Sequence, residues 1–414
     1  MTSNSSRPRI AMLIGHNLAG DSRVNKTYEI ARSYASESEL FRYPINLNTN
    51  SNNFSSRARA IIRTTSIQIA TIRFLEKVLP SFMFEQIKQA RRTHHLKRLE
   101  VISKSFLARL RAFQPEIVYA HDADTLKAAV QYKNESGCKV VYDAHEYLRG
   151  LSRPDPGWQP AMLWAESNID QADIVITVSD QIAELLRNDY ALAELPRVVL
   201  NAPPGAQLPN KREIETFRQQ SGIPSHVPFH VYVGSANETR GLSTMVESLK
   251  HVDSHHIGFV INNLQFRRNL LSLARKFGVS ERVHFSNYVD SDLVTSFISD
   301  ATSGISPVLR RPNHELSCFT KFYEYAQAGL PIITSDVKVM AQTVRDNQIG
   351  EVFRAGDAQD LANCMQKVVE KNEYYRVGIV PELLKQWSWE DQIPIVLEVF
   401  EEATFQNPRG IDRD

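Results

Sequence analysis

The sequence lacks the marks of a secreted, disulfide-bonded or membrane-spanning protein. Its 414 residues contain only three cysteines, at positions 138, 318 and 364, and none forms a CxxC pair. An odd number of scattered cysteines argues against a disulfide framework or a zinc site and fits a reducing compartment. No run of about 18 apolar residues occurs, so we expect no transmembrane helix. The apolar run after the polar residues 1–8 is too short for a signal peptide, and we expect a cytoplasmic protein.

The chain also lacks a charge excess and any nucleic-acid-binding motif. It has 48 basic and 47 acidic residues, a formal net charge of +1, so we expect no nucleic acid among its partners. The balance hides an asymmetry, because residues 57–111 carry 13 basic side chains against 3 acidic ones, a net charge of +10.

This basic segment lies within residues 48–113, which we interpret as a mostly helical insertion with apolar residues between the charges. Two interpretations stay open. The insertion is either a solvated helical hairpin packed on a sheet, or a surface that rests on anionic lipid or grips a charged acceptor. The second interpretation would make the protein peripheral on the inner face of the membrane.

Elsewhere, short apolar runs alternate with amphipathic helical patterns. Most runs are continuous, which is typical of strands covered on both faces, and the alternation predicts parallel sheets. The expected strands are residues 10–14, 117–120, 140–143, 174–178, 229–234, 257–261, 283–285, 304–308, 332–334 and 351–353. Asn, Pro and Gly residues at 201–205 mark a boundary. The predicted fold is α/β, with two doubly wound Rossmann-like domains, 1–203 and 204–385, that face each other across a cleft and are followed by a tail, 386–414.

Three strand ends carry candidate site residues. Gly15 and Gly20 flank the turn after the first strand and would let the backbone approach a ligand, although a tight strand–helix connection explains them equally well. The absence of GxGxxG makes a dinucleotide-binding turn unexpected. His121 with Asp122, and His145 with Glu146, end the next two strands, and we expect both pairs to project into one crevice.

Two short acidic motifs, Asp122-Ala123-Asp124 and Asp290-Ser291-Asp292, match the DxD pattern that holds a metal and a diphosphate in some glycosyltransferases. Both lie where a helix is expected to begin, and aspartate is a favoured capping residue there. We prefer the capping interpretation for both, and we expect no metal.

The most informative stretch is residues 314–336. A helix from about Phe319 would place Lys321 and Glu324 on one face, three residues apart near its N-terminus, and Gly329 would end it. A cation and helix amides suit a diphosphate, and a carboxylate suits ribose hydroxyls. The alternative is an intrahelical ion pair worth only a few tenths of a kcal/mol.

Six motifs in this order resemble the retaining GT-B glycosyltransferases of family four, the group 1 nucleotide-sugar transferases. They are DSRV at 21–24, YDAHE at 142–146, ADIVITVS at 172–179 with NAP at 201–203, Gly234 with RGL at 240–242, the signature-like 317–336, and WSWE at 387–390. The resemblance covers most of the chain. It implies that the tail crosses back to the first domain.

The resemblance also implies roles for the site residues. Arg240 and Lys321 would contact the donor diphosphate and Glu324 the ribose, with Thr320 and Gly234 beside them. Gly15 and Gly20, on the donor-binding side, would border the sugar and the acceptor. The implied catalytic residues are His121, Lys321 and Arg240, and the acceptor or sugar side would include Arg23, His145, Glu146 and Glu315. No divalent metal or other cofactor is implied.

The sequence departs from the family pattern at three places. Leu316 stands where many members have a glutamate, with Glu315 one place earlier. Phe319-Thr320 replaces the Pro-Asn before the signature lysine. Asn262-Asn263 replaces a glycine-rich turn, with Arg267 and Arg268 as substitutes for a second phosphate-binding base.

The leading hypothesis is a retaining glycosyltransferase that moves a sugar from a nucleotide sugar to a polysaccharide or lipid-linked acceptor in cell-surface glycan synthesis. One alternative is a GT-B sugar-nucleotide epimerase that uses Asp122 and Glu146 as acid and base. Another is a non-catalytic GT-B subunit that binds a partner enzyme through the basic segment.

Overall fold

The computed structural model describes residues 7–15, 22–43, 80–151, 155–205, 214–287 and 289–405. The chain divides into two compact units. Unit 1 comprises residues 1–199 and 396–414, and unit 2 comprises residues 200–395. Each unit contains a parallel six-stranded sheet with helices against it, which confirms the predicted class of two doubly wound Rossmann-like folds.

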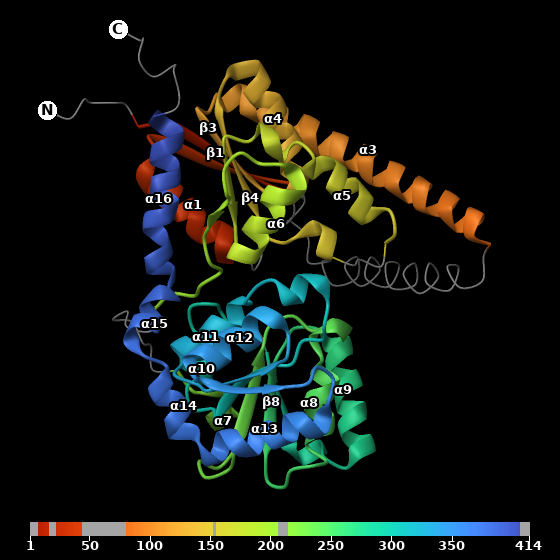
Figure 1. Cartoon of the computed structure of the whole chain (residues 1–414), viewed down its shortest axis with the longest axis vertical. Helices are drawn as coiled ribbons and strands as arrows, with labels where there is room; N and C mark the ends of the chain where they lie inside the picture. The colour runs from red at the N-terminus through yellow and green to blue at the C-terminus, as the bar shows by residue number, and fades with distance from the viewer. Residues whose placement is uncertain are drawn as a thin grey trace, which may run out of the picture. The chain divides into compact units, whose positions relative to one another are not determined.

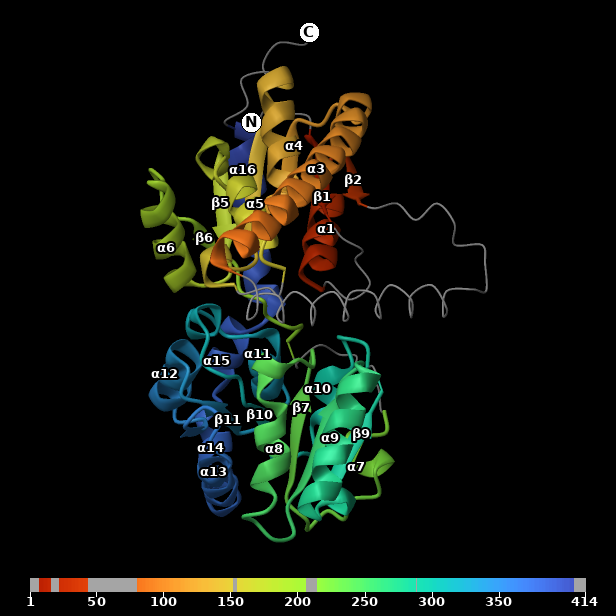
Figure 2. The same ribbon diagram turned by 90° about the vertical axis from the view of Figure 1, so that its right-hand side faces the viewer.

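The sheet of unit 1 has the strand order β2-β1-β3-β4-β5-β6. Its strands are β1 (Arg9–Ile14), β2 (Glu37–Arg42), β3 (Ile117–His121), β4 (Lys139–Ala144), β5 (Ile174–Thr177) and β6 (Arg197–Val198). Its helices are α1 (Ser22–Tyr34), α3 (Ser81–Phe113), α4 (Ala123–Ser136), α5 (Trp158–Glu166) and α6 (Asp180–Tyr190). One face of the sheet carries α1 and the end of α16 (Trp389–Phe405), and the other carries α3, α4 and α5 (Figures 1 and 2).

The sheet of unit 2 has the order β12-β11-β10-β7-β8-β9. Its strands are β7 (Phe229–Val233), β8 (His256–Val260), β9 (Val283–Ser286), β10 (Ser303–Ser306), β11 (Ile332–Ser335) and β12 (Gly350–Phe353). Its helices are α7 (Phe217–Gln220), α8 (Leu242–Ser248), α9 (Leu264–Phe277), α10 (Val294–Ile298), α11 (Thr320–Gln327), α12 (Lys338–Asn347), α13 (Ala358–Glu370), α14 (Asn372–Gly378), α15 (Pro381–Gln386) and the start of α16.

Unit 2 has an apolar core on each side of its sheet. Val231 and Ile332 belong to one core, whereas Ile333 and Tyr232, their neighbours in the chain, belong to the other. Side chains on a strand alternate between the two faces, so a strand that is covered on both sides needs a continuous apolar run. This explains why the central strands were predicted correctly.

Two strands, β2 and β6, were missed by the sequence-based prediction. Both are edge strands. The sequence of β2 is ESELFR, and only Phe41 in it is buried, while β6 has just two residues. An edge strand pairs on one side only and commonly carries charged side chains, so it lacks the apolar run that identified the other ten.

The basic insertion contains α3, a single helix of 33 residues. Its apolar contacts begin at His95, and the buried positions that follow include Leu99, Phe106 and Leu110. None of residues 81–94 is buried, and Phe82 is 64 % exposed. The rest of the predicted insertion, through residue 79, lies outside the described residues. No helix in the described part of the chain is long and apolar enough to span a membrane.

Candidate functional site

In unit 2, the candidate site lies at the N-terminus of α11. This helix begins at Thr320, and its N-cap residue Phe319 makes no side-chain capping bond. Gly329 follows its C-terminus with a φ of 71°, a left-handed conformation that glycine adopts without strain. The predicted helix and its glycine stop are therefore confirmed. Because no side chain caps the helix, its first backbone N–H groups remain able to bind an anion.

Two cationic side chains lie against the same aromatic ring at this helix end. The Nζ of Lys321 is 5.0 Å from the ring centroid of Phe319, and the Cζ of Arg240 is 4.3 Å from it. Lys321 also lies 5.0 Å from the ring of Tyr232 and is only 6 % exposed. The Nε and Nη1 atoms of Arg240 are buried without a hydrogen-bond partner among the described residues.

This arrangement is electrostatically costly without a ligand. Burial lowers the pKa of Lys321 well below its usual range, Arg240 lowers it further, and Glu324 opposes the shift. The buried cation of Lys321 and the half-buried cation of Arg240, beside an uncapped helix N-terminus, form a site that an anion would stabilise. Lys321, Glu324 and Thr320, predicted as donor-binding residues, lie together on the first turns of α11. Glu324 is 8 % exposed.

Two glycines with positive φ adjoin these cations. Gly234 directly follows β7 with a φ of 127°, and a Cβ atom there would lie 3.1 Å from the Cε of Lys321. Gly241, directly after Arg240, has a φ of 67°, and a Cβ atom there would lie 1.9 Å from the carbonyl oxygen of Pro307. The Arg-Gly-Leu turn thus needs its glycine for close backbone packing.

Sequence reasoning missed three residues of this site: His314, Phe319 and Tyr232. His314 donates from Nδ1 to the carbonyl oxygen of Leu309 (2.7 Å), and its ring packs edge-on against Phe319. Burial lowers the pKa of His314 to about 4, with a further effect of Arg240 and Lys321. The sequence did contain one indication of this site, because Phe319 places a large aromatic residue where the family motif has a different one.

Other predicted residues of unit 2 have structural partners. Glu315 accepts a hydrogen bond from the backbone N–H of Lys338 at the start of α12 (2.6 Å) and lies 3.3 Å from Arg310. Arg267 donates to the carbonyl oxygen of Ser286 and to Asn287. The prediction that Asp290 caps a helix is wrong, because α10 begins at Val294 with Leu293 as its N-cap.

In unit 1, the two predicted strand-end histidines meet. His121 Nδ1 is 3.1 Å from His145 Nε2, and Asp143 Oδ2 lies 3.6 Å and 3.5 Å from these two nitrogens. Arg23 forms a buried bidentate ion pair with Asp143 (2.9 and 3.0 Å) and donates to the carbonyl oxygen of Val199 (2.7 Å). The guanidinium of Arg23 is therefore buried inside unit 1 and bonded to these two partners, although the sequence predicted it on the acceptor or sugar side.

Charges are strongly coupled in this cluster. Burial would lower the pKa of His145, but the carboxylates of Asp122 and Asp143 outweigh it and raise the pKa to about 9. Burial would likewise raise the pKa of Asp143, yet Arg23 and His145 hold it well below its usual range. At neutral pH the cluster therefore contains a carboxylate between two cations.

Among the described residues, His121, Asp143 and His145 also form a group whose ligand atoms are close enough together to hold a metal ion. The chemistry of the cluster fits a metal poorly. A histidine ligand must be unprotonated, whereas His145 is protonated at neutral pH. The guanidinium of Arg23 already pairs with both oxygens of Asp143, so a cation would have to compete with it.

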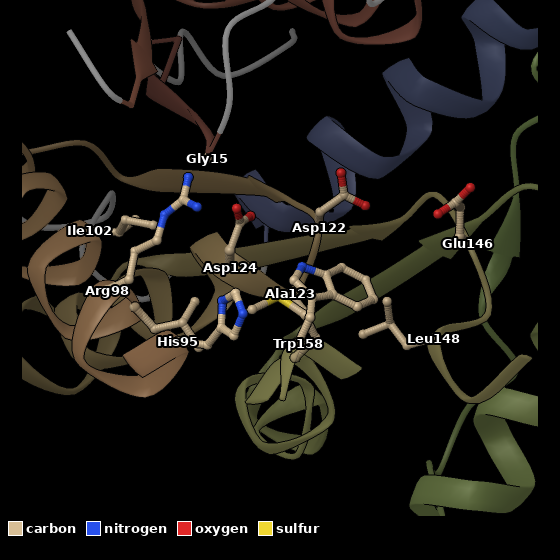
Figure 3. A pocket seen from close by; sticks show the side chains of 12 residues that line it. Gly15, His95, Arg98, Ile102, Asp122, Ala123, Asp124, Glu146, Leu148 and Trp158 are labelled. Atoms are coloured by element: carbon tan, nitrogen blue, oxygen red, sulfur yellow. The ribbon is translucent and has the colours of Figure 1, made fainter. Parts of the chain in front are cut away.

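A pocket of about 340 Å³ lies beside this cluster, lined by residues of α3, the start of α4, α5 and the segments that follow β1 and β4 (Figure 3). Gly15, predicted at the sugar side, lines it, and a Cβ atom at Gly15 would lie 1.9 Å from Asp124 Oδ2. Glu146 lines it as well. His121 is fully buried behind it. Gly20 lies outside the described residues.

Asp122 occupies the N-cap position of α4, as the capping interpretation predicted, but its side chain makes no capping hydrogen bond. Its carboxylate lies 3.6 Å from His145 Nδ1. Asp122 therefore has the position of a helix cap, but its carboxylate interacts with His145 and not with the N-terminus of the helix.

Comparisons with known proteins place the chain in a family. Residues 213–379 match the model described as "Glycosyl transferases group 1", and residues 86–202 match "Glycosyltransferase Family 4". The lipopolysaccharide glucosyltransferase WaaG of Escherichia coli is 27 % identical over 160 residues, which are 38 % of this chain and 40 % of WaaG. The chain spans less than half the length of the curated relatives that it matches first.

Two solved structures are similar over nearly their whole length. Sucrose-phosphate synthase from Thermosynechococcus elongatus has a TM-score of 0.71 at 16 % identity, with 96 % of this chain and 99 % of that chain covered. Anabaena HepE in complex with UDP-glucose has a TM-score of 0.67 at 14 % identity, with 95 % and 100 % covered. These likenesses show the fold. Together with the two family matches, they establish that the chain belongs to the group 1 glycosyltransferases of family 4, retaining glycosyltransferases with the GT-B fold.

Proposed function

We propose that the chain is a retaining glycosyltransferase that binds the diphosphate of a nucleotide sugar at the N-terminus of α11. The observation that carries this proposal is the pair of cations on Phe319. Lys321 is buried with a lowered pKa, and Arg240 has two buried nitrogens without a partner among the described residues. Buried charges are normally paired, and a diphosphate would supply the missing negative charge.

The same groups would assist the reaction. When the bond between the sugar and the diphosphate breaks, negative charge grows on the departing diphosphate. Lys321 and Arg240, held in place by Phe319 and Tyr232, would stabilise that charge without a divalent metal. Glu324, three residues after Lys321, would accept hydrogen bonds from the ribose hydroxyls.

The similar proteins suggest a donor and an acceptor class. HepE was solved with UDP-glucose, and WaaG is a lipopolysaccharide glucosyltransferase. We propose a UDP-hexose donor and a polysaccharide or lipid-linked acceptor of the cell surface, reached by a cytoplasmic enzyme. His121, at the end of β3, is fully buried against His145, so we do not include it among the residues that contact the transferred sugar.

Thermal stability in the presence of UDP, UDP-glucose, ADP-glucose or GDP-mannose tests the donor site. A ligand at a hundred times its Kd should stabilise the fold by about 2.7 kcal/mol. We expect UDP-glucose to raise the melting temperature of the wild type, and Arg240→Ala and Lys321→Ala to abolish that shift. Arg275→Ala, an exposed arginine in the last turn of α9, is the matched control. Equal shifts in all four proteins would overturn the donor site.

Product analysis separates the reaction classes. A transferase releases UDP and elongates an acceptor, whereas an epimerase converts the sugar nucleotide without an acceptor and releases no UDP. A non-catalytic subunit would do neither.

A further inference from the structure

Asp122 has a backbone conformation that is rare outside glycine. Its φ is 61° and its ψ is 162°. Gln114, Ala191 and Gln348 also have positive φ, but they are helix C-cap residues with ψ between 40° and 56°, which is the ordinary left-handed region. The combination at Asp122 is essentially restricted to glycine and costs free energy, and such residues cluster at functional sites.

The backbone of Asp122 bonds to Asp143 and Thr125, but its carboxylate serves none of these bonds. Its side chain does not cap α4. Instead, the carboxylate is 34 % exposed, lies 3.6 Å from the charged His145, and lines the pocket of unit 1. The strained turn thus presents a carboxylate to the pocket.

The pocket combines an acidic side with an aromatic and apolar side. Asp122, Asp124 and Glu146 line it, and Arg98 is the one lysine or arginine among the described residues of its lining. Figure 3 shows the three carboxylates along one side and the indole of Trp158 on the other. Leu99, Ile102, Leu148 and Met162 complete the apolar wall. The volume of about 340 Å³ is within the usual range for small-molecule sites, about 300–1,000 Å³.

A pyranose ring matches both sides of this pocket. Its hydroxyl groups donate charge-assisted hydrogen bonds to carboxylates, and its apolar C–H face packs on an aromatic ring. We propose that this pocket is the subsite for the accepting sugar residue, and that Asp122 makes it selective for a neutral or amino-bearing sugar over a phosphorylated or carboxylated one. This inference rests on the proposed transferase function.

The selectivity follows from charge. An anionic group that entered the pocket would meet carboxylates that outnumber the lining cation three to one. An ammonium group would gain an ion pair with Asp122 at a partly desolvated position, where charge interactions are stronger than in water. Both ring nitrogens of His145 already face a carboxylate, one that of Asp122 and the other that of Asp143. His145 would have to give up one of these two interactions to bind a substrate phosphate.

Binding of simple glycosides to the full-length chain, measured by saturation-transfer NMR without donor, tests the proposal. The probes are methyl glucoside, methyl glucosaminide, methyl glucuronide and glucose 6-phosphate. For the wild type we expect methyl glucosaminide to bind at least tenfold more tightly than glucose 6-phosphate. Asp122→Asn should reduce that ratio several-fold, and Trp158→Ala should weaken every probe. Glu184→Gln, which removes an exposed carboxylate on α6, should change nothing.

Asp122→Gly supplies a second variant that also reports on the strain. Since glycine tolerates the backbone conformation of Asp122, this variant should have a melting temperature at least equal to that of the wild type while losing the selectivity. A purely structural Asp122 would show a lower melting temperature and unchanged selectivity.

The proposal is overturned if glucose 6-phosphate binds as tightly as methyl glucosaminide, if no probe shows saturable binding, or if Asp122→Asn behaves like Glu184→Gln. Donor binding is measured separately by the UDP-glucose shift. A normal donor shift without glycoside selectivity would reject this subsite alone, and loss of the donor shift would reject the proposed function.

Discussion

Arg23 and Asp143, 120 residues apart in the sequence, form a bidentate ion pair inside unit 1. Their side chains are 5 % and 0 % exposed. Tyr119 donates a further hydrogen bond to Asp143 (3.0 Å), and Arg23 donates to the carbonyl oxygen of Val199. The pair therefore links α1 and β4 to the residue after β6.

Removing one partner of this ion pair should destabilise the protein strongly. Arg23→Met leaves the charge of Asp143 buried without its guanidinium partner, and the expected loss is about 3–5 kcal/mol. Arg32→Met, at an exposed position of the same helix, should cost less than about 0.5 kcal/mol. Urea denaturation of the two variants checks this. Similar losses in both would contradict the structural role of the pair.

We expect Lys321 to lower the stability of the ligand-free protein and to be required for donor binding. Lys321→Met removes a buried cation beside Arg240, so we expect a higher melting temperature without ligand and no stabilisation by UDP-glucose. Calorimetry with and without UDP-glucose measures both effects. A lower melting temperature in the absence of ligand would show that Lys321 stabilises the apoprotein and would weaken the electrostatic argument.

Lys321 and Glu324 should affect catalysis in different ways. The loss of a charged hydrogen bond, about 1.5–3 kcal/mol, corresponds to a decrease in kcat/KM of roughly ten- to over a hundredfold. Lys321→Ala should reduce kcat more, because the phosphate charge grows in the transition state. Glu324→Gln should weaken donor binding at least as much as turnover. The donor Kd and the steady-state kinetics of both variants test this difference. Wild-type values in both variants would show that the two residues form only an intrahelical ion pair.

Acid should destabilise unit 2 through its histidines. Burial lowers the pKa of His255 and of His284 to about 4, with smaller effects of Arg282 and His256. Their pKa in the unfolded chain is about 6.5, so between about pH 6.5 and pH 4 the unfolded chain binds more protons than the folded one. Their contribution to stability is present above pH 6.5 and is lost as the pH falls through this window.

Urea denaturation between pH 8 and pH 4 measures this loss. His284→Gln should show a shallower decrease than the wild type. His251→Gln, at an exposed position, should follow the wild-type curve. Parallel curves for all three proteins would exclude His284 as a contributor.

Transfer should not depend on a divalent metal. The motivation is the cation pair of Arg240 and Lys321, together with a histidine cluster in which Arg23 already pairs with both oxygens of Asp143. We expect EDTA to leave UDP release from UDP-glucose unchanged. Loss of activity in EDTA that magnesium or manganese restores would contradict the proposed chemistry.

The basic segment 57–111 should bind anionic membranes. Its described part includes α3, where Phe82 and Met83 are exposed and Lys88 and Lys104 are solvated. A basic residue near an anionic surface contributes about 1 kcal/mol. Co-sedimentation with phosphatidylglycerol vesicles should exceed that with phosphatidylcholine vesicles and decrease with salt. Lys88→Glu with Lys104→Glu should reduce it, and Arg275→Glu in unit 2 should not. Equal binding to both kinds of vesicle would exclude this mechanism.

The sequence by itself determined the fold class and the position of α11. Continuous apolar runs identified the central strands, because both faces of each sheet are buried. Gly329 and Pro331 marked the end of α11 because backbone conformation is a local property. The expectation that His121 and His145 share one crevice followed from the rule that parallel strands end at the same edge of a sheet.

Only the tertiary structure decided which groups pair. Asp143 pairs with Arg23, Lys338 with Glu315, and Arg240 lies on Phe319, and each of these contacts joins residues that are distant in the chain. No local pattern encodes such contacts, because they depend on how helices pack on the sheet. The strained φ of Asp122 is of the same kind: an aspartate before a helix predicts a cap, and only packing around the end of β3 turns its carboxylate toward the pocket.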